Sequence, residues 1–184
     1  MGWIIVLALA AAALWAVSAY NALVRKRIIV SEAWSGIDAQ LKRRTELVPN
    51  LVETVKGYAS HERDALEDVT RLRTAGAGAG SIAERAELEK QFAGAIGRLM
   101  AVAEAYPDLK ASANFQALQG ELATIENDIQ FARRFYNGAV RDYNIAIEQA
   151  PSNLVASAFA FQQAPFFELD SEDERAVPQV KFGA

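Results

Sequence analysis

Apolar side chains recur along residues 30–62 at steps that alternate between four and three residues. This is the spacing of a helix that packs against other helices along one seam. The seam positions are Val30, Trp34, Ile37, Leu41, Arg44, Val48, Leu51, Val55, Tyr58 and Glu62. We predict a long helix that runs to about Arg73. A kink or a local break is expected at Pro49, because proline lacks a backbone donor and crowds the carbonyl of Thr45.

An uncharged apolar segment precedes this helix. Residues 3–19 contain no charge, and apolar positions continue to Val24, which gives about 20 residues, the length that spans a bilayer as a helix. Aromatic residues stand near both ends of the segment, as membrane-interface residues do. They are Trp3, Trp15 and Tyr20. The sequence therefore predicts a transmembrane anchor.

Basic residues follow the anchor at once, and they predict its orientation. They are Arg25, Lys26 and Arg27. The positive-inside rule then places the short N-terminus outside and the main domain in the cytoplasm. These three residues are also candidates for contact with lipid head groups. The alternative is a cleaved signal peptide ending at Val17-Ser18-Ala19, but no basic region precedes the apolar segment and the helical pattern continues past Ala19.

Small residues repeat within the anchor. Ala8, Ala12 and Ala16 are spaced four residues apart, which would let a second helix approach closely. Alanine is also common throughout this segment. We favour that simpler reading over a dedicated dimer face.

Two further segments have helical periodicity. Residues 81–105 carry one apolar face, made of Leu88, Phe92, Ile96, Leu99 and Val102. Residues 109–149 repeat the seam, at Phe115, Leu118, Leu122, Ile125, Ile129, Ala132, Tyr136, Val140, Tyr143 and Ile147. Residues 74–81 form a glycine–alanine connector, interpreted as a hairpin turn, and Ser81 with Glu84 fits a capping box. Pro151 is expected to stop the last segment.

These segments predict the fold class. Connectors this short make neighbouring helices antiparallel, and the chain lacks the alternating β-branched runs of a sheet. We therefore predict an all-α protein with an N-terminal transmembrane helix followed by an antiparallel three- to four-helix bundle. The predicted division is an anchor over residues 1–24, a bundle over 25–164 and an acidic tail over 165–184, with Phe166 and Phe167 packed against the end of the bundle.

Composition excludes several kinds of chemistry. The chain of 184 residues has a net charge of −4, so no overall basic field indicates a nucleic-acid partner. It has no cysteine, which excludes disulfides, thiol catalysis and zinc–thiolate sites. His61 is the single histidine, and Ala65 stands where a second zinc ligand would follow it. No nucleophile stands with a base, so we predict no metal, no cofactor and no enzymatic activity.

Several polar residues are candidates for core or interaction roles. Arg44 lies on the seam, where its guanidinium should meet a carboxylate or carbonyls, and Glu121 and Asp128 are the candidate partners. We favour a residue that sets the register, or that extends to solvent, over a ligand-binding role. The pairs Tyr136-Asn137 and Tyr143-Asn144 recur seven residues apart on one helical stripe, so their tyrosines are expected to pack and their asparagines to form hydrogen bonds across the seam. Other basic residues are candidates for anion binding or for surface ion pairs. They are Lys42, Arg43, Arg133 and Arg134.

Short motifs along most of the chain resemble those of a bacterial family. They are Tyr20-Asn21, Glu32–Ser35, Asp38, Gln40–Arg44, Pro49–Ala59, His61-Glu62, Tyr106–Lys110, Asn114-Phe115, Leu118-Gln119, Glu121-Leu122, Ala132–Asn137, Tyr143-Asn144, Pro151, Asn153, Phe166–Glu168, Pro178, Val180 and Phe182. In their residues and in their order along the chain, these motifs resemble the LemA family of membrane proteins. The resemblance implies a helical bundle that is anchored in the inner membrane of a bacterial cell. It suggests a membrane zinc metalloprotease of protein quality control as a partner, while magnetosome-associated relatives suggest organising or shaping of membranes.

Two functions follow as hypotheses. The first is a membrane-anchored, non-enzymatic scaffold or adaptor that forms homo-oligomers or presents a helical face to a membrane partner. The second is an enzyme, or a sensor of a small ligand or a lipid head group, with a polar bundle cavity lined by Arg44, Tyr58, His61 and Tyr136. Enclosed polar residues would support the sensor, and a dry, filled core would contradict it.

Overall fold

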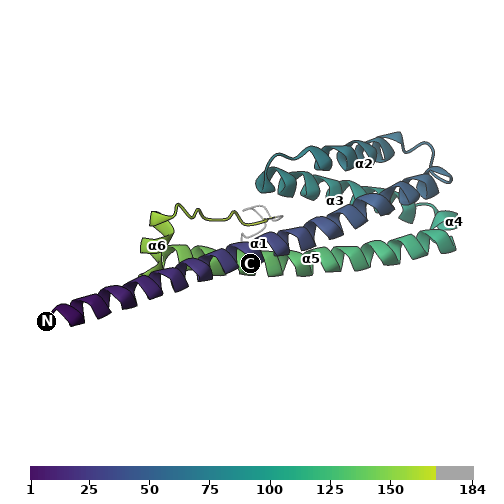
Figure 1. Cartoon of the computed structure of the whole chain (residues 1–184). Coiled ribbons are helices and arrows are strands. Elements are labelled where there is room, and N and C mark those ends of the chain that lie inside the picture. Colours follow the sequence, from purple (N-terminus) through teal and green to yellow (C-terminus); the bar gives the residue numbers. More distant parts are fainter. Residues whose placement is uncertain (169–184) are drawn as a thin grey trace, which may run out of the picture. The chain divides into compact units, whose positions relative to one another are not determined.

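The computed structural model describes residues 1–168 and consists of helices joined by short turns (Figure 1). The elements are α1 Gly2–Lys56, α2 Arg63–Ala75, the 3₁₀ turn η1 Gly76–Gly78, α3 Ile82–Glu104, α4 Pro107–Lys110, α5 Ala113–Glu148 and α6 Ser152–Ala158. No strand occurs among residues 1–168, and the predicted all-α class is confirmed. The predicted acidic run and the family motifs at Pro178, Val180 and Phe182 lie outside the described residues.

Helix α1 continues through Pro49, so of the expected kink or local break the break does not occur. A proline inside a helix costs about 3 kcal/mol, because it removes one hydrogen bond and crowds the preceding turn. Val48 and Leu51 flank it and are fully buried, and burial of each such side chain contributes about 1.5–3 kcal/mol. Packing on both sides of Pro49 therefore holds this part of α1 in helical form.

The division of the first predicted helix falls at residues 57–62 instead. Helix α1 ends at Lys56 and α2 begins at Arg63, so the prediction of a single helix reaching Arg73 is wrong. Gly57 follows the last helical residue, and the amides of Tyr58 and Ala59 both donate to the carbonyl of Val55. Because the helix has ended, Tyr58 and Glu62 leave the seam, and Tyr58 is 50% exposed.

The helices divide between two compact units, and the first contains residues 1–42 and 125–166. Here α1 and α5 are antiparallel. The rings of Trp34 and Tyr136 lie 5.6 Å apart edge to face, whereas the earlier residue Leu23 packs near the later residue Ile147. Seam positions of both helices are buried in this unit, including Ile37 and Ile129, as the spacing predicts.

The second unit contains residues 43–124 together with 167 and 168. Helices α2 and α3 pack against each other, and their contact includes an ion pair of 3.1 Å between Arg98 and Asp68. The glycine–alanine connector forms the turn between them, as predicted. Ser81 caps α3, because its hydroxyl accepts a hydrogen bond from the amide of Glu84 at 3.1 Å. The Glu84 carboxylate accepts in return from the amide of Gly80 at 2.8 Å, one residue earlier than in the usual capping box.

Candidate functional site

The first half of α1 has the composition and exposure of a membrane helix. It is the one helix among residues 1–168 that is long and apolar enough to cross a membrane, and none of the residues in its most apolar window is buried. Large side chains along it are open to solvent, among them Trp3, Ile4, Leu7 and Leu14. In water such a surface would be unfavourable by about 25 cal/mol for each Å². The expected interface residues differ, since Trp15 is partly exposed and Tyr20 is half-buried in the first unit.

The three basic residues that follow the apolar segment differ in exposure and in their neighbours. Arg25 and Arg27 are exposed, and Lys26 is half-buried. The guanidinium of Arg27 lies 5.3 Å from the ring centre of Phe161, a distance that fits a cation–π contact. Arg25 is therefore the most accessible of the three for a lipid phosphate.

Arg44 belongs to a buried ionic cluster in the second unit. Its guanidinium donates to a carboxylate oxygen of Glu89 on α3 and lies 5.3 Å from the centre of the Phe92 ring. The other carboxylate oxygen of Glu89 lies 2.8 Å from Arg85, which also donates to the carbonyl of Gly76. Arg44 and Glu89 are both almost completely buried. A buried charge has to be paired, and two guanidinium groups here share one carboxylate.

The partner that the structure gives Arg44 is Glu89, which the sequence did not identify. Glu121 lies 3.8 Å from the neighbouring Arg43 instead, in a half-exposed pair. The signal for Glu89 was present in the sequence, because it stands on a stripe of buried positions in α3 with the same steps of three and four residues. The stripe is Glu89, Phe92, Ile96, Leu99 and Ala103. An acidic residue on that stripe corresponds to the basic residue on the stripe of α1.

The tyrosine–asparagine pairs of α5 hold the chain segment that follows α6. The hydroxyl of Tyr136 donates to the carbonyl of Pro165 at 2.8 Å. Asn144 forms two hydrogen bonds with the backbone of Ala164, donating to its carbonyl at 3.0 Å and accepting from its amide at 2.9 Å. Burial raises the pKa of the Tyr136 hydroxyl above its ordinary value. Tyr136 and Asn144 therefore hold the segment around Ala164 and Pro165 of the same chain, rather than a partner helix.

The remaining predicted residues of α5 differ in their burial. Tyr143 is buried, and burial raises the pKa of its hydroxyl while the positive charge of Arg27 opposes that rise. Asn137 and Arg133 are half-buried, and Arg134 is exposed.

Three of the residues expected to line the polar cavity of the sensor hypothesis lie in the second unit. Tyr58 and His61 are exposed, and Arg44 is held by Glu89. No group of three His, Cys, Asp or Glu side chains suited to a metal ion occurs in the described part of the chain.

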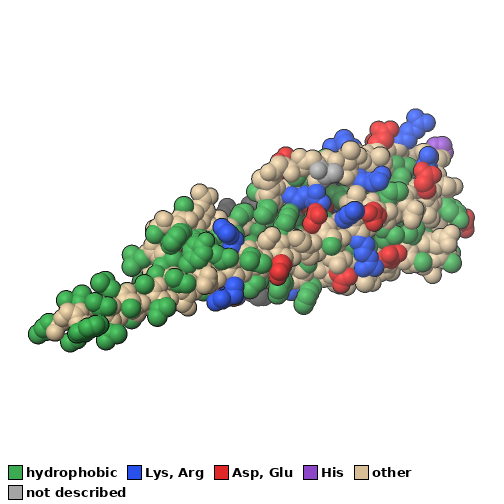
Figure 2. Space-filling view, in the orientation of Figure 1, with side chains coloured by type: hydrophobic (Ala, Val, Ile, Leu, Met, Phe, Trp, Pro, Cys, Tyr) green, Lys and Arg blue, Asp and Glu red, His purple; other side chains and the backbone are tan. Residues whose placement is uncertain are grey.

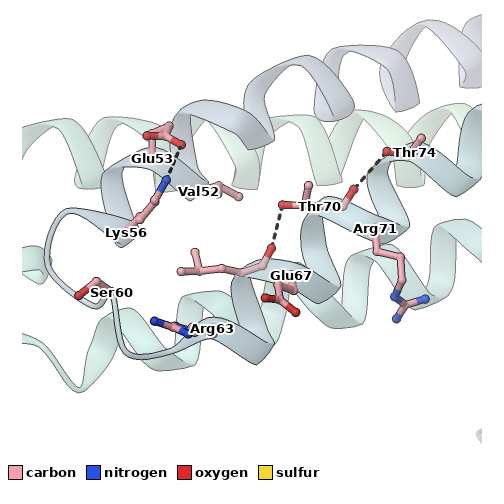
Figure 3. A pocket seen from close by; sticks show the side chains of 10 residues that line it. Val52, Glu53, Lys56, Ser60, Arg63, Glu67, Thr70, Arg71 and Thr74 are labelled. Carbon is pink, nitrogen blue, oxygen red and sulfur yellow. Dashed lines mark hydrogen bonds and ion pairs between the residues drawn. The ribbon is translucent and has the colours of Figure 1, made fainter.

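An open groove of about 780 Å³ lies in the second unit, between the end of α1 and α2 (Figure 3). Val52 and Leu66 supply apolar surface. The hydroxyls of Thr70 and Thr74 donate to carbonyls of their own helix, at 2.8 and 3.3 Å. Such back-bonded hydroxyls do not need a partner in the groove, so the methyl groups are left to line it.

Charged side chains surround the groove, and they differ in their partners. Lys56 lies 3.7 Å from Glu53, and Arg71 lies 2.9 Å from Asp68. The Arg71 hydrogen bond is the main cause that holds the pKa of the Asp68 carboxyl below its ordinary value. Arg63, at the first turn of α2, forms no hydrogen bond or ion pair with any described residue.

A smaller groove of about 350 Å³ lies in the first unit. Helix α1 contributes Ala33 and Gly36 to it, and α5 contributes Ala132. Phe131 and Phe135 stand beside it and are largely exposed. The spacing analysis did not identify these two residues, because they lie off the seam.

Taken together, the helices define an all-α protein with one long N-terminal apolar helix that continues into its helical units. The chain belongs to the LemA family, whose sequence model matches residues 33–182.

Characterised relatives carry two kinds of name. Magnetosome protein MamQ 2 of Paramagnetospirillum magneticum is 29% identical over 175 residues, covering 81% of this chain and 64% of that protein. Magnetosome protein MamQ of Magnetospirillum gryphiswaldense is 26% identical over 176 residues, covering 80% of this chain and 64% of that protein. Protein LemA of Metamycoplasma hominis is 29% identical over 156 residues, covering 84% of this chain and 71% of that protein. The chain thus spans less than two thirds of the length of the magnetosome relatives.

Proposed function

We propose that this protein is a single-pass membrane protein of the bacterial inner membrane that acts without catalysis, as an adaptor for a membrane partner. The first part of α1 crosses the bilayer, with the N-terminus outside and the helical units in the cytoplasm. The observation that carries this proposal is the fully exposed apolar surface of α1, in a helix that continues without interruption into packed helical units. Arg25 to Arg27, on one flank of the span, support the orientation.

The groove between α1 and α2 is the partner site in this proposal. Its apolar surface and its size suit a segment of another protein, and Arg63 supplies a positive charge that no described residue neutralises. The occupant is therefore a segment of a membrane partner that places a carboxylate against Arg63. A membrane metalloprotease is the partner that the family resemblance suggests. A second copy of the chain in the groove would give a homo-oligomeric scaffold instead.

The test is extraction of the native complex in a mild detergent, with light scattering for size and mass spectrometry for composition. Two charge reversals on the same helix are compared, Arg63→Glu and Arg73→Glu, because Arg73 is exposed on α2 but does not line the groove. The adaptor proposal expects a fixed stoichiometric partner that is lost with Arg63→Glu and retained with Arg73→Glu. A large species of this chain alone would replace the adaptor by a scaffold. A monomer in the unaltered protein, or a partner lost equally with both variants, would contradict the groove.

The orientation is tested separately. Protease added to spheroplasts should leave the helical units intact and digest them only after the membrane is opened. Digestion from outside would contradict the cytoplasmic placement.

A further inference from the structure

Helix α6 packs against α1 at the end of the apolar segment, not beyond it. Val155 and Ala156 of α6 form a buried cluster with Leu23. Around this cluster lie Ala16, Ala19 and Tyr20 of α1. If the span begins near Trp3, about 20 residues are needed to cross the hydrocarbon, so these contacts fall on its last two turns. A short helix of the C-terminal half therefore lies at the depth where lipid acyl chains meet head groups.

The segment that contains α6 has no charge. Residues 149–167 contain no Asp, Glu, Lys or Arg, although 23% of the whole chain is charged. On the face seen in Figure 2, hydrophobic side chains cover the N-terminal end of α1 and continue over α6 before the first lysine and arginine side chains appear. Burial within the unit does not explain this composition, because two of its large side chains point outward. Leu154 is 68% exposed and Phe159 is 61% exposed.

Aromatic rings and a basic residue complete the surface. The ring of Tyr20 lies 4.8 Å from that of Phe159 and 5.6 Å from that of Phe161. The guanidinium of Arg27 lies 5.3 Å from the centre of the Phe161 ring, which brings its positive charge beside these aromatic rings. Aromatic rings that lie beside basic side chains are typical of surfaces at the head-group level.

We propose that α6 and the turn after it form a second membrane contact, in which Leu154 and Phe159 enter the boundary between head groups and acyl chains of the cytoplasmic leaflet. The ligand is a lipid surface with anionic head groups, whose phosphates meet Arg25 and Arg27. The contact rests on the proposed membrane span of α1. It makes the first unit a two-point attachment, with one helix through the bilayer and one lying on it.

The experiment measures the depth of single labels in the full chain. Because the protein has no cysteine, each variant carries one labelling site. Leu154→Cys and Phe159→Cys are labelled with the environment-sensitive fluorophore NBD and reconstituted in vesicles of phosphatidylcholine and phosphatidylglycerol. Lipids with a nitroxide on an upper acyl carbon then act as quenchers. Both labels should emit at shorter wavelength than in water and lose emission to the quencher.

Two control positions separate this contact from the anchor itself. Leu14→Cys lies within the span, and Ala39→Cys is an exposed site about 22 Å beyond Val24 along α1. Quenching at Leu14 with none at Leu154 and Phe159 would overturn the second contact and leave the anchor standing. No quenching at Leu14 would overturn the anchor and with it this inference. Equal quenching at Ala39 would show that the labels adhere to lipid wherever they stand, which also removes the support.

Discussion

At the scale of single residues, the buried pair of Arg44 and Glu89 shows how one ionic contact can specify a packing arrangement. Each charge lies on the apolar stripe of its own helix, so each helix alone would bury an unpaired charge. Only a packing that brings the two stripes together at this level avoids that cost, which exceeds the gain from any single apolar contact. The pair therefore favours one register over its alternatives.

Removal of one member of the pair is predicted to be strongly destabilising. Glu89→Gln removes the buried carboxylate that pairs with the Arg44 guanidinium, so the free energy of unfolding should fall by about 3–5 kcal/mol. The double variant Arg44→Met/Glu89→Leu should recover most of the loss. Urea unfolding of the full chain in detergent, followed by circular dichroism, measures both.

Glu87→Gln is the matched control for that experiment. Glu87 is exposed on the same helix, where it accepts a hydrogen bond from Gln91 at 2.9 Å. Glu87→Gln should change the free energy of unfolding by no more than about 0.5 kcal/mol. If the two single variants were equally mild, the ion pair would have no structural role.

Tyr136 leads to a prediction about alkaline pH. Burial raises the pKa of its hydroxyl, so the folded state holds the proton more tightly than the unfolded state does. Its contribution to stability is complete below the unfolded pKa of about 10 and is lost as the pH rises through the folded pKa. Urea unfolding between neutral pH and high pH should show a decline that is smaller in Tyr136→Phe, although this variant loses the hydrogen bond to Pro165 at neutral pH. An unchanged alkaline decline in the variant would mean that other groups cause it.

The sequence identified the polar residues of the core more readily than their partners. Arg44 was visible because an arginine interrupts an apolar stripe, and the buried positions of Tyr136 and Tyr143 follow from spacing alone. The partners require three-dimensional information. The sequence predicts Glu121 as a partner because the third helical segment is expected to face Arg44. In the structure α3 supplies Glu89 to Arg44, and Glu121 pairs with the neighbouring residue Arg43.

At the scale of elements, helix type was predictable and helix ends were not. Periodicity gave α1, α3 and α5, and the capping residues gave the start of α3. Pro49 does not break α1, because Val48 and Leu51 on either side of it are buried, and local propensity does not include that burial. Helix α6 is too short for periodicity to reveal, since two turns contain only two seam positions.

The end of α6 offers a test of local backbone strain. Its last turn is a Schellman motif, in which the amide of Phe161 donates to the carbonyl of Ala156 at 2.9 Å and that of Ala160 to the carbonyl of Ser157 at 3.3 Å. Ala160 occupies the left-handed position of this motif, with φ of 54°, which costs a residue with a Cβ about 1–2 kcal/mol.

Ala160→Gly should therefore stabilise the first unit. Glycine removes the strain but adds about 0.4–1 kcal/mol of unfolded-state entropy, so a net gain of about 0.5–1 kcal/mol is expected. Thermal unfolding in detergent measures it. The control is Ala158→Gly in the last turn of the helix, which should be destabilising by a similar amount. Destabilisation by both variants would contradict the strain.

At the scale of the whole molecule, charge placement along the chain is predicted to decide orientation. Arg25→Glu/Lys26→Glu removes two of the three basic residues beside the span, so part of the population should insert in the opposite sense. A membrane-impermeant maleimide on Ala39→Cys in intact cells reports the fraction turned outward. Arg73→Glu/Arg141→Glu, two exposed sites far along the chain, should leave labelling at background. Equal labelling in both double variants would mean that net charge, not its position, decides.

Because α1 is unbroken, the rotation between two of its faces about the helix axis is fixed by the number of residues that separate them. Each residue of an α-helix turns the chain by about 100°, so the face that the apolar span presents to lipid is locked to the face that carries the seam. An insertion of one residue between Val24 and Val30 would rotate one face against the other by that angle, whereas an insertion of seven would restore the alignment to within about 20°. The number of helical residues between the span and the seam thus determines which face of the anchor is turned toward lipid.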